Sequence, residues 1–231
     1  MQNCCAVIAA AGSSSRMGKG VSKQFIPLLG IPVIIRTLMA FDAAETVSAS
    51  VVVCRAGDEG RLQQYIDLYA IKKVAAVVAG GATRQESAAA GAMAVPEGFG
   101  LIAVHDGARP LITPEKINLC VNACLKTGAA ALGVPLKDTV KKVDGSGFVV
   151  STPDRSGMVA VQTPQVFRYG LYMKALRDAF AAGENYTDDC QLAEKAGVKV
   201  SVCSGDYGNI KITTPEDICI AEAILRMRGV K

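Results

Sequence analysis

Short apolar runs alternate along this chain with longer amphipathic stretches. Six runs have the near-continuous apolar character of buried strands, at Cys5–Ala10, Ser48–Cys54, Lys73–Ala79, Leu101–Asp106, Ala129–Leu136 and Val198–Cys203. Six stretches have apolar residues at helical spacing, at Pro32–Ala44, Asp58–Ala70, Thr83–Val95, Thr113–Gly128, Tyr169–Ala182 and Pro215–Arg228. Strands and helices that alternate in this way predict a mostly parallel sheet covered by helices on both faces.

The fold class that follows is α/β, a Rossmann-like three-layer α/β/α arrangement. Two helix starts are well defined, because Thr113 and Thr214 each precede a proline and an acidic residue in the first turn, a pattern typical of capped N-termini. In parallel sheets of this kind, ligands bind beyond the carboxyl ends of the strands. We therefore look for the site in the segments that directly follow the predicted strands.

One segment, residues 137–161, departs from the alternation. Its sequence DTVKKV alternates, DGSG is a turn signal, and FVVST returns, which together predict a β-hairpin. Its strands are too polar for the centre of a sheet, and an isolated hairpin needs a surface to pack on. We expect a single domain, 1–231, with an arm at 137–161 that packs on a second copy of the chain in a homodimer.

Composition excludes several classes of protein. Of 231 residues, 50% are hydrophobic and 20% charged, as in globular domains. A net charge of +4 without a basic block disfavours nucleic-acid binding. No apolar run approaches the ~20 residues of a membrane span, and we expect neither a signal peptide nor, because the chain stops at Lys231, a fused second enzyme. Eight cysteines without a C-x-x-C and a single histidine indicate reduced core thiols in a cytoplasmic protein.

The segment after the first strand, AAAGSSSRMGKGVSKQF at residues 9–25, combines small residues with three cations, Arg16, Lys19 and Lys23. It has neither the G-x-G-x-x-G of dinucleotide-binding folds nor a Walker loop. Its backbone N–H groups form a candidate anion cradle. Met17 is apolar and is expected to pack, which favours a folded loop, with Arg16 held in place, over an ordinary solvated loop.

Further motifs follow in order along the chain: GGATRQES (80–87), VHDGARP (104–110), LKDTVK (136–141), QTPQVF (162–167), YTDDCQLAE (186–194) and NIKITTPED (209–217). With the A-A-G-x-x-x-R-M and Lys-Gln of the first loop, this series resembles the 2-C-methyl-D-erythritol 4-phosphate cytidylyltransferase family of the non-mevalonate isoprenoid pathway. The resemblance spans nearly the whole chain, and the ordered set is far more specific than any one motif.

The resemblance implies attack by a phosphate-monoester oxygen on the α-phosphorus of CTP, with release of pyrophosphate. A monoester is largely ionised at neutral pH, since its second pKa is near 6, so the reaction needs cations more than it needs a general base. By resemblance Arg16 and Lys23 stabilise the transition state, and Arg155 and Lys211 position the methylerythritol phosphate. We interpret His105 as a structural hydrogen-bonding residue.

The resemblance also implies the nucleotide contacts, Ala10, Ala11, Gly12, Gly81, Ser87, Asp106 and Arg109, with Asp106 helping to hold Mg²⁺. Family members often have an acidic residue after the second glycine of the GGATRQES motif, whereas this chain has Ala82; the nucleotide contact there falls to the backbone. The remaining contacts to the polyol phosphate are Thr139, Thr163 and Thr187. We expect Thr139, Arg155 and Thr163 to act in trans, meeting Thr187 and Lys211 of the other subunit.

Three alternatives stay open. D-ribitol-5-phosphate cytidylyltransferases share several of these motifs but are expected to have serine and valine where this chain has Gly107 and Ala108. Hexose-1-phosphate nucleotidyltransferases do not account for the arm or the late motifs. A non-catalytic nucleotide-binding module would not require all of Arg16, Lys23, Arg155 and Lys211.

Overall fold

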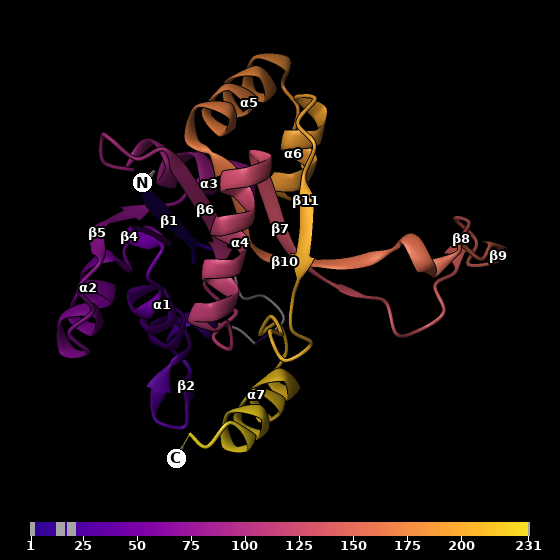
Figure 1. Ribbon diagram of the computed structural model, residues 1–231. Helices are drawn as coiled ribbons and strands as arrows, with labels where there is room; N and C mark the ends of the chain where they lie inside the picture. Colours follow the sequence, from indigo (N-terminus) through magenta and orange to yellow (C-terminus); the bar gives the residue numbers. More distant parts are fainter. Residues whose placement is uncertain (1–2, 13–16, 18–21, 231) are drawn as a thin grey trace.

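A seven-stranded sheet forms the centre of the computed structural model, which describes residues 3–12, 17 and 22–230 (Figure 1). The strand order is β11-β7-β10-β6-β1-β4-β5. The bounds of these strands are β1 Cys4–Ala9, β4 Val47–Cys54, β5 Val74–Ala79, β6 Leu101–Asp106, β7 Ala129–Pro135, β10 Val159–Arg168 and β11 Ser201–Ser204. Neighbouring strands are parallel except at β10, which runs antiparallel to both β6 and β7.

Helices cover both faces of this sheet. One apolar cluster joins the sheet to α1 Val33–Ala43, α2 Glu59–Leu68 and α4 Pro114–Thr127. A second cluster, on the other face, joins it to α3 Arg84–Met93, α5 Tyr169–Ala182 and α6 Asp189–Lys195. A third, smaller cluster holds α7 Pro215–Met227 against the short hairpin of β2 Pro27–Leu28 and β3 Ile31–Pro32. The predicted three-layer α/β/α fold is confirmed.

The ranges predicted from the sequence omit one strand of the central sheet, the two-residue strands β2 and β3, and one short helix. All six predicted strands and all six predicted helices are present, with their ends displaced by a few residues at most. Strand β10 is missed because its QTPQ sequence contains a proline and three polar residues, a composition typical of a loop. Its polar side chains are buried and hydrogen-bonded, whereas Val166 and Phe167 pack in the core. The missed helix, α6, has only seven residues.

The hairpin arm is present, with shorter strands than predicted. It consists of β8 Lys142–Val143 and β9 Val149–Ser151, which pair antiparallel. The turn is closed by Asp144, whose carboxylate accepts hydrogen bonds from the N–H groups of Ser146 and Phe148. Residues 159–161 already pair with β7 in the main sheet, so the hairpin is shorter than 137–161 at that end. The arm projects away from the rest of the chain (Figure 1).

Within the described part of the chain, every helix is too short or too polar to cross a bilayer.

Candidate active site

A cavity of about 410 Å³ opens beyond the carboxyl ends of β1 and β6, at the edge of the sheet where the sequence predicts a ligand. Four parts of the chain form its wall: the ends of the two strands, the start of α3, the one-turn helix η2 Lys23–Phe25, and the segment that precedes α7. The residues that line it are Ala9, Ala11, Gly12, Lys23, Gln24, Gly81, Ala82, Thr83, Arg84, Ser87, Asp106, Ala108, Lys211 and Thr213.

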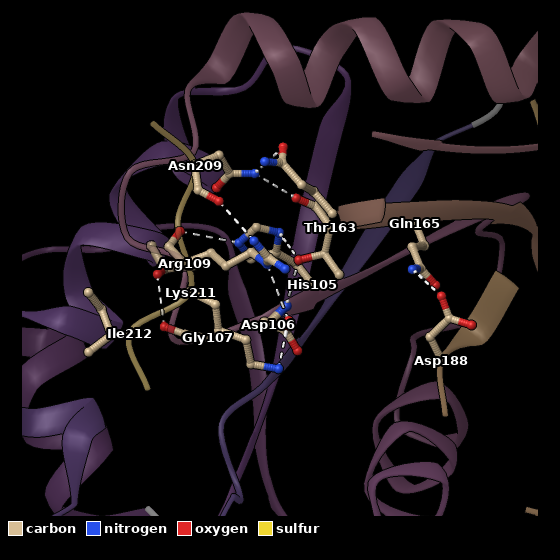
Figure 2. Close-up of polar contacts among 12 residues, drawn as sticks. His105, Asp106, Gly107, Arg109, Thr163, Gln165, Asp188, Asn209, Lys211 and Ile212 are labelled. Atoms are coloured by element: carbon tan, nitrogen blue, oxygen red, sulfur yellow. Dashed lines mark hydrogen bonds and ion pairs between the residues drawn. The ribbon is translucent and has the colours of Figure 1, made fainter. Parts of the chain in front are cut away.

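Asp106 is the acidic centre of this cavity (Figure 2). Its Oδ2 lies 3.0 Å from Lys211 Nζ and 3.3 Å from Arg109 Nε. Burial would raise the pKa of Asp106, but the charges of Lys211 and Arg109 outweigh it and lower the pKa to about 2. The carboxylate therefore stays ionised at neutral pH and holds two cationic side chains at the carboxyl end of β6.

Hydrogen bonds that involve Thr163 and His105 hold Asp106 in position. The Asp106 N–H donates to Thr163 Oγ1 at 3.1 Å, and the same hydroxyl lies 3.0 Å from His105 Nδ1. The other ring nitrogen of His105 lies 3.4 Å from the Arg109 carbonyl oxygen. His105 is fully buried, and burial lowers its pKa to about 3. Both ring nitrogens are engaged, which agrees with the structural role predicted for this histidine.

The buried histidine gives the protein a predictable acid sensitivity. His105 is the only histidine of the chain; folded it stays neutral down to about pH 3, whereas unfolded it takes up a proton near pH 6.5. Since the unfolded state binds more protons below pH 6.5, the free energy of unfolding should fall with falling pH. Linkage gives a loss of about 2 kcal/mol between pH 7 and pH 5.

Urea unfolding of the wild type and a His105→Gln variant, in buffer containing EDTA, measures this loss. The variant should be nearly insensitive to pH over the same interval, because it has no histidine to titrate. An identical pH dependence of the two proteins would show that His105 is not the group responsible.

The cavity wall at the start of α3 depends on two glycines. A Cβ on Gly80 would lie 2.5 Å from Ala11 Cβ, and one on Gly81 would lie 2.4 Å from Glu86 Cβ. A glycine at position 80 therefore allows this segment to approach the residue that follows β1, and a glycine at position 81 leaves room for Glu86 at the start of α3. Thr83 caps α3 by accepting from the Glu86 N–H. Glu86 in turn accepts a hydrogen bond from the Ala82 N–H at 2.8 Å. This N–H belongs to the backbone that we expected to contact the nucleotide in place of an acidic side chain.

Lys23 joins the first loop to the segment that carries Lys211. Its Nζ donates to the Ile212 carbonyl oxygen at 2.8 Å, which holds this ammonium group at the cavity wall one residue from Lys211. Met17 packs against the cluster around α7, as its apolar side chain predicted. Arg16, expected to act with Lys23, lies outside the described residues.

The structure brings together only part of the predicted set. The cavity collects Ala11, Gly12, Lys23, Gly81, Ser87, Asp106 and Lys211. Arg109 contacts Asp106, Ala10 is buried behind the wall, and Thr187 bonds to Gln191. Thr139 and Arg155 are exposed and flank the hairpin of β8 and β9 in the sequence. The Arg155 guanidinium contacts the Lys137 carbonyl oxygen, so a single chain does not bring these two residues to the cavity.

The placement of Thr163 corrects one prediction. We expected this residue to reach the site of the other subunit together with the arm. It lies instead in β10, is 4% exposed, and supports Asp106 and His105 of its own chain. The expectation that it acts in trans is wrong, because β10 has already entered the main sheet before Thr163.

Sequence reasoning also missed side chains that shape the cavity. Arg84 lines the cavity and forms an ion pair with Asp189 Oδ2 at 2.5 Å. The other carboxylate oxygen of Asp189 accepts a hydrogen bond from the Tyr172 hydroxyl. Arg55 donates two hydrogen bonds, of 3.0 and 2.8 Å, to the Gly12 carbonyl oxygen. Arg84 stands within the GGATRQES motif, which was a usable signal, whereas nothing in the sequence around Arg55 indicates its contact.

Comparisons with known proteins agree with this geometry. The family model described as IspD, 2-C-methyl-D-erythritol 4-phosphate cytidylyltransferase, matches residues 4–227. A protein of that name from Pelotomaculum thermopropionicum is 44% identical over 99% of this chain and 96% of its own length. Another from Geobacillus thermodenitrificans is 45% identical over 96% and 97%.

Solved structures give the same result. The 4-diphosphocytidyl-2C-methyl-D-erythritol synthase of Anaerococcus prevotii superposes with a TM-score of 0.88 at 33% identity, covering 97% of this chain and 96% of that one. The 2-C-methyl-D-erythritol 4-phosphate cytidylyltransferase of Thermus thermophilus gives 0.79 at 30% identity, covering 98% and 100%. Because the family model matches almost the entire length of this chain, the chain belongs to the 2-C-methyl-D-erythritol 4-phosphate cytidylyltransferase family.

Proposed function

We propose that the cavity beside Asp106 is where this cytidylyltransferase joins CTP to 2-C-methyl-D-erythritol 4-phosphate. The products are 4-diphosphocytidyl-2-C-methyl-D-erythritol and pyrophosphate, in isoprenoid precursor synthesis. The observation that carries the assignment of the site is the ionised carboxylate of Asp106 paired with Lys211 and Arg109, with the ammonium group of Lys23 in the wall of the same cavity.

The reaction needs no general base. The phosphate monoester of the acceptor is largely a dianion at neutral pH, and its oxygen attacks the α-phosphorus as the bond to the pyrophosphate oxygen breaks. Two anionic substrates must approach each other while charge builds on the phosphoryl oxygens, so fixed cations dominate the barrier. In this proposal Lys23 and Arg16 stabilise that charge, and Lys211 and Arg155 position the acceptor phosphate.

The nucleotide lies along the small-residue wall in this proposal. Ala10, Ala11 and Gly12 leave room for it, and Gly81 and Ser87 contact the base and ribose. The close packing of Gly80 and Gly81 supports this assignment, since side chains there would fill the wall.

Asp106 fits a magnesium ion that is held mainly by substrate. Mg²⁺ takes one or two carboxylates, several waters and phosphate oxygens. Among the described residues no group of three or more potential metal ligands surrounds Asp106, and Lys211 and Arg109 already occupy its Oδ2. The ion would screen the charge of the phosphates, with Asp106 as its protein ligand.

A homodimer accounts for the exposed arm. Phe148, Val149 and Val150 are 73%, 60% and 60% exposed, more than an isolated hairpin stably presents to water. A second copy that covers them also brings Thr139 and Arg155 of one arm to Lys211 and Thr187 of the other chain. We further propose a cytoplasmic enzyme, because all eight cysteines are free thiols.

Pyrophosphate release tests the function directly. Addition of 2-C-methyl-D-erythritol 4-phosphate to enzyme, CTP and Mg²⁺ should start release, and excess EDTA should stop it until Mg²⁺ is restored. Release that does not depend on the acceptor would contradict cytidylyl transfer.

The arrangement in trans has its own test by complementation. A heterodimer of one Lys211→Ala chain and one Arg155→Ala chain, purified through two different tags, should recover about half of the wild-type activity, because one of its two sites is intact. Each variant homodimer should be nearly inactive. The control pairs a wild-type chain with a chain that carries both changes.

That control should be nearly inactive, since each of its two sites then lacks one residue. If the arm instead acts within its own chain, the expected activities are reversed. The heterodimer of a Lys211→Ala chain and an Arg155→Ala chain is then inactive, and the control heterodimer keeps half of the activity.

A further inference from the structure

A buried amide in the cavity wall has an acceptor that the protein does not use. Gln24 lies in η2 directly after Lys23, is 5% exposed, and lines the cavity. Its side-chain oxygen Oε1 is buried and accepts no hydrogen bond. A buried carbonyl group without a donor destabilises the free protein, so an amide at this place calls for an explanation.

The other buried glutamines show what a structural amide looks like in this fold. Gln165 is 1% exposed and uses both ends, donating to Asp188 Oδ2 and accepting from the Cys190 N–H, each at 2.9 Å. The same holds for Gln85 and Gln162. Among the described residues, Gln24 is the only buried glutamine whose oxygen is left without a donor.

One further buried amide has an unused oxygen, and it differs in its surroundings. Asn209 Oδ1 also accepts no hydrogen bond. Its Nδ2, however, donates to Gln162 Oε1 and to the Thr163 carbonyl oxygen, and Asn209 does not line the cavity. The combination of an unused acceptor with a place in the cavity wall is found at Gln24.

The unused atom restricts the chemistry of its partner. A carbonyl oxygen accepts and cannot donate, so it does not pair with phosphate oxygens, whose partners here are the cations Lys23 and Lys211. Both substrates carry hydroxyl groups close to the phosphates that react: the ribose of CTP and the polyol chain of the acceptor. A hydroxyl group donates to a carbonyl oxygen with ordinary hydrogen-bond geometry.

We infer that Gln24 is a substrate-binding residue whose Oε1 accepts a hydrogen bond from a substrate hydroxyl group beside the reacting phosphates. This inference rests on the proposed function for the identity of the two substrates. The contact forms only when substrate is bound, so Gln24 contributes to recognition of a hydroxyl group and not to the stability of the free enzyme.

The test uses Gln24→Met, which keeps the length of the side chain and removes both polar atoms. The kcat/KM of this variant should fall about 10-fold, the effect of one lost hydrogen bond of ordinary strength. Its Tm without substrate should equal that of the wild type or exceed it, because no internal hydrogen bond is lost.

The matched control is Gln165→Met, the same replacement at a buried glutamine whose hydrogen bonds are all made. It removes the donor to Asp188 Oδ2 and the acceptor of the Cys190 N–H and should lower Tm by about 4 °C or more. A Gln24→Met protein that loses as much Tm as this control would overturn the inference, since its amide would then be structural.

Deoxy substrates identify the hydroxyl group. The wild type and Gln24→Met are compared on CTP, 2′-deoxy-CTP and 3′-deoxy-CTP, and on methylerythritol phosphate analogues that lack the C2 or C3 hydroxyl. With the substrate that lacks the partner hydroxyl, the two enzymes should have equal kcat/KM. The comparison thereby shows whether the hydroxyl group that donates to Gln24 Oε1 belongs to the ribose of CTP or to the polyol.

Two further outcomes contradict the inference: no loss of kcat/KM in Gln24→Met, or the same loss with every substrate. The turnover of the wild type with CTP and methylerythritol phosphate tests the proposed function separately, because the inference depends only on the ratio between variant and wild type.

Discussion

A Lys23→Ala variant should bind CTP within several-fold of the wild type and lose about 10²–10³-fold in kcat. The ammonium group lines the cavity, and its bond to the Ile212 carbonyl oxygen keeps it there before any substrate arrives. A cation fixed in this way interacts most strongly with the charge that develops on the phosphoryl oxygens. Its loss should therefore raise the barrier more than it weakens the ground-state complex.

The control for this prediction is Lys73→Ala. Lys73 Nζ also donates to a backbone carbonyl oxygen, that of Ala44 at 2.7 Å, but it does not line the cavity. The control should keep wild-type kcat, which separates loss of a lysine-to-carbonyl hydrogen bond from loss of a catalytic charge. Calorimetric CTP binding and steady-state kinetics give the two quantities. Equal losses in affinity and kcat for Lys23→Ala would refute the transition-state role.

The sequence predicts the parts of the fold that local patterns determine. The start of α4 is an example, since Thr113 precedes Pro114 and its hydroxyl caps the helix in the structure. The start of α7 has the reciprocal cap of Thr214 and Asp217. Strand β6 has its predicted bounds, Leu101–Asp106, because a continuous apolar run ends there at a charged residue.

Strand β10 shows where local patterns fail. It is a central strand that runs against its two neighbours, yet Gln162 and Gln165 make it look like a loop. These amides are satisfied by Asp206, Asp188 and Cys190, which are 23 to 44 residues distant in sequence. A single sequence does not reveal such partners, and the same gap caused the wrong placement of Thr163.

The residues of the candidate site also differ in how far the local sequence predicts them. Lys23 was predictable as a cation of an anion-binding loop because it follows a run of small residues, whereas Asp106 was assigned by the resemblance. Lys211 was assigned only by resemblance, since NIKITT has no pattern that turns a lysine toward Asp106. Gln24 belongs to the Lys-Gln pair of the first loop, but the sequence does not show that its oxygen would be buried without a donor.

The second large effect concerns the acceptor. The enzyme should prefer 2-C-methyl-D-erythritol 4-phosphate to D-ribitol 5-phosphate by about 100-fold or more in kcat/KM. We expect the Gly107-Ala108 pair to distinguish this chain from the ribitol enzymes, and the surroundings of the pair are closely packed. A Cβ on Gly107 would lie 2.9 Å from Ile34 Cδ1 and 3.1 Å from Ala10 Cβ. Ala108 lines the cavity and is 2% exposed.

A side chain at position 107 would press on Ile34 Cδ1 and Ala10 Cβ, one residue from Asp106. The small pair therefore shapes the cavity wall beside Asp106. We expect the pair to contribute to the choice of acceptor through the position of Asp106.

The most direct test of the account is pyrophosphate release from CTP with Mg²⁺, measured in parallel with the two polyol phosphates. The account predicts rapid release with 2-C-methyl-D-erythritol 4-phosphate and about 100-fold lower kcat/KM with D-ribitol 5-phosphate. A preference for ribitol phosphate would contradict the assigned acceptor but keep the cytidylyl-transfer chemistry. Silence with both acceptors would contradict catalysis itself and favour a nucleotide-binding module.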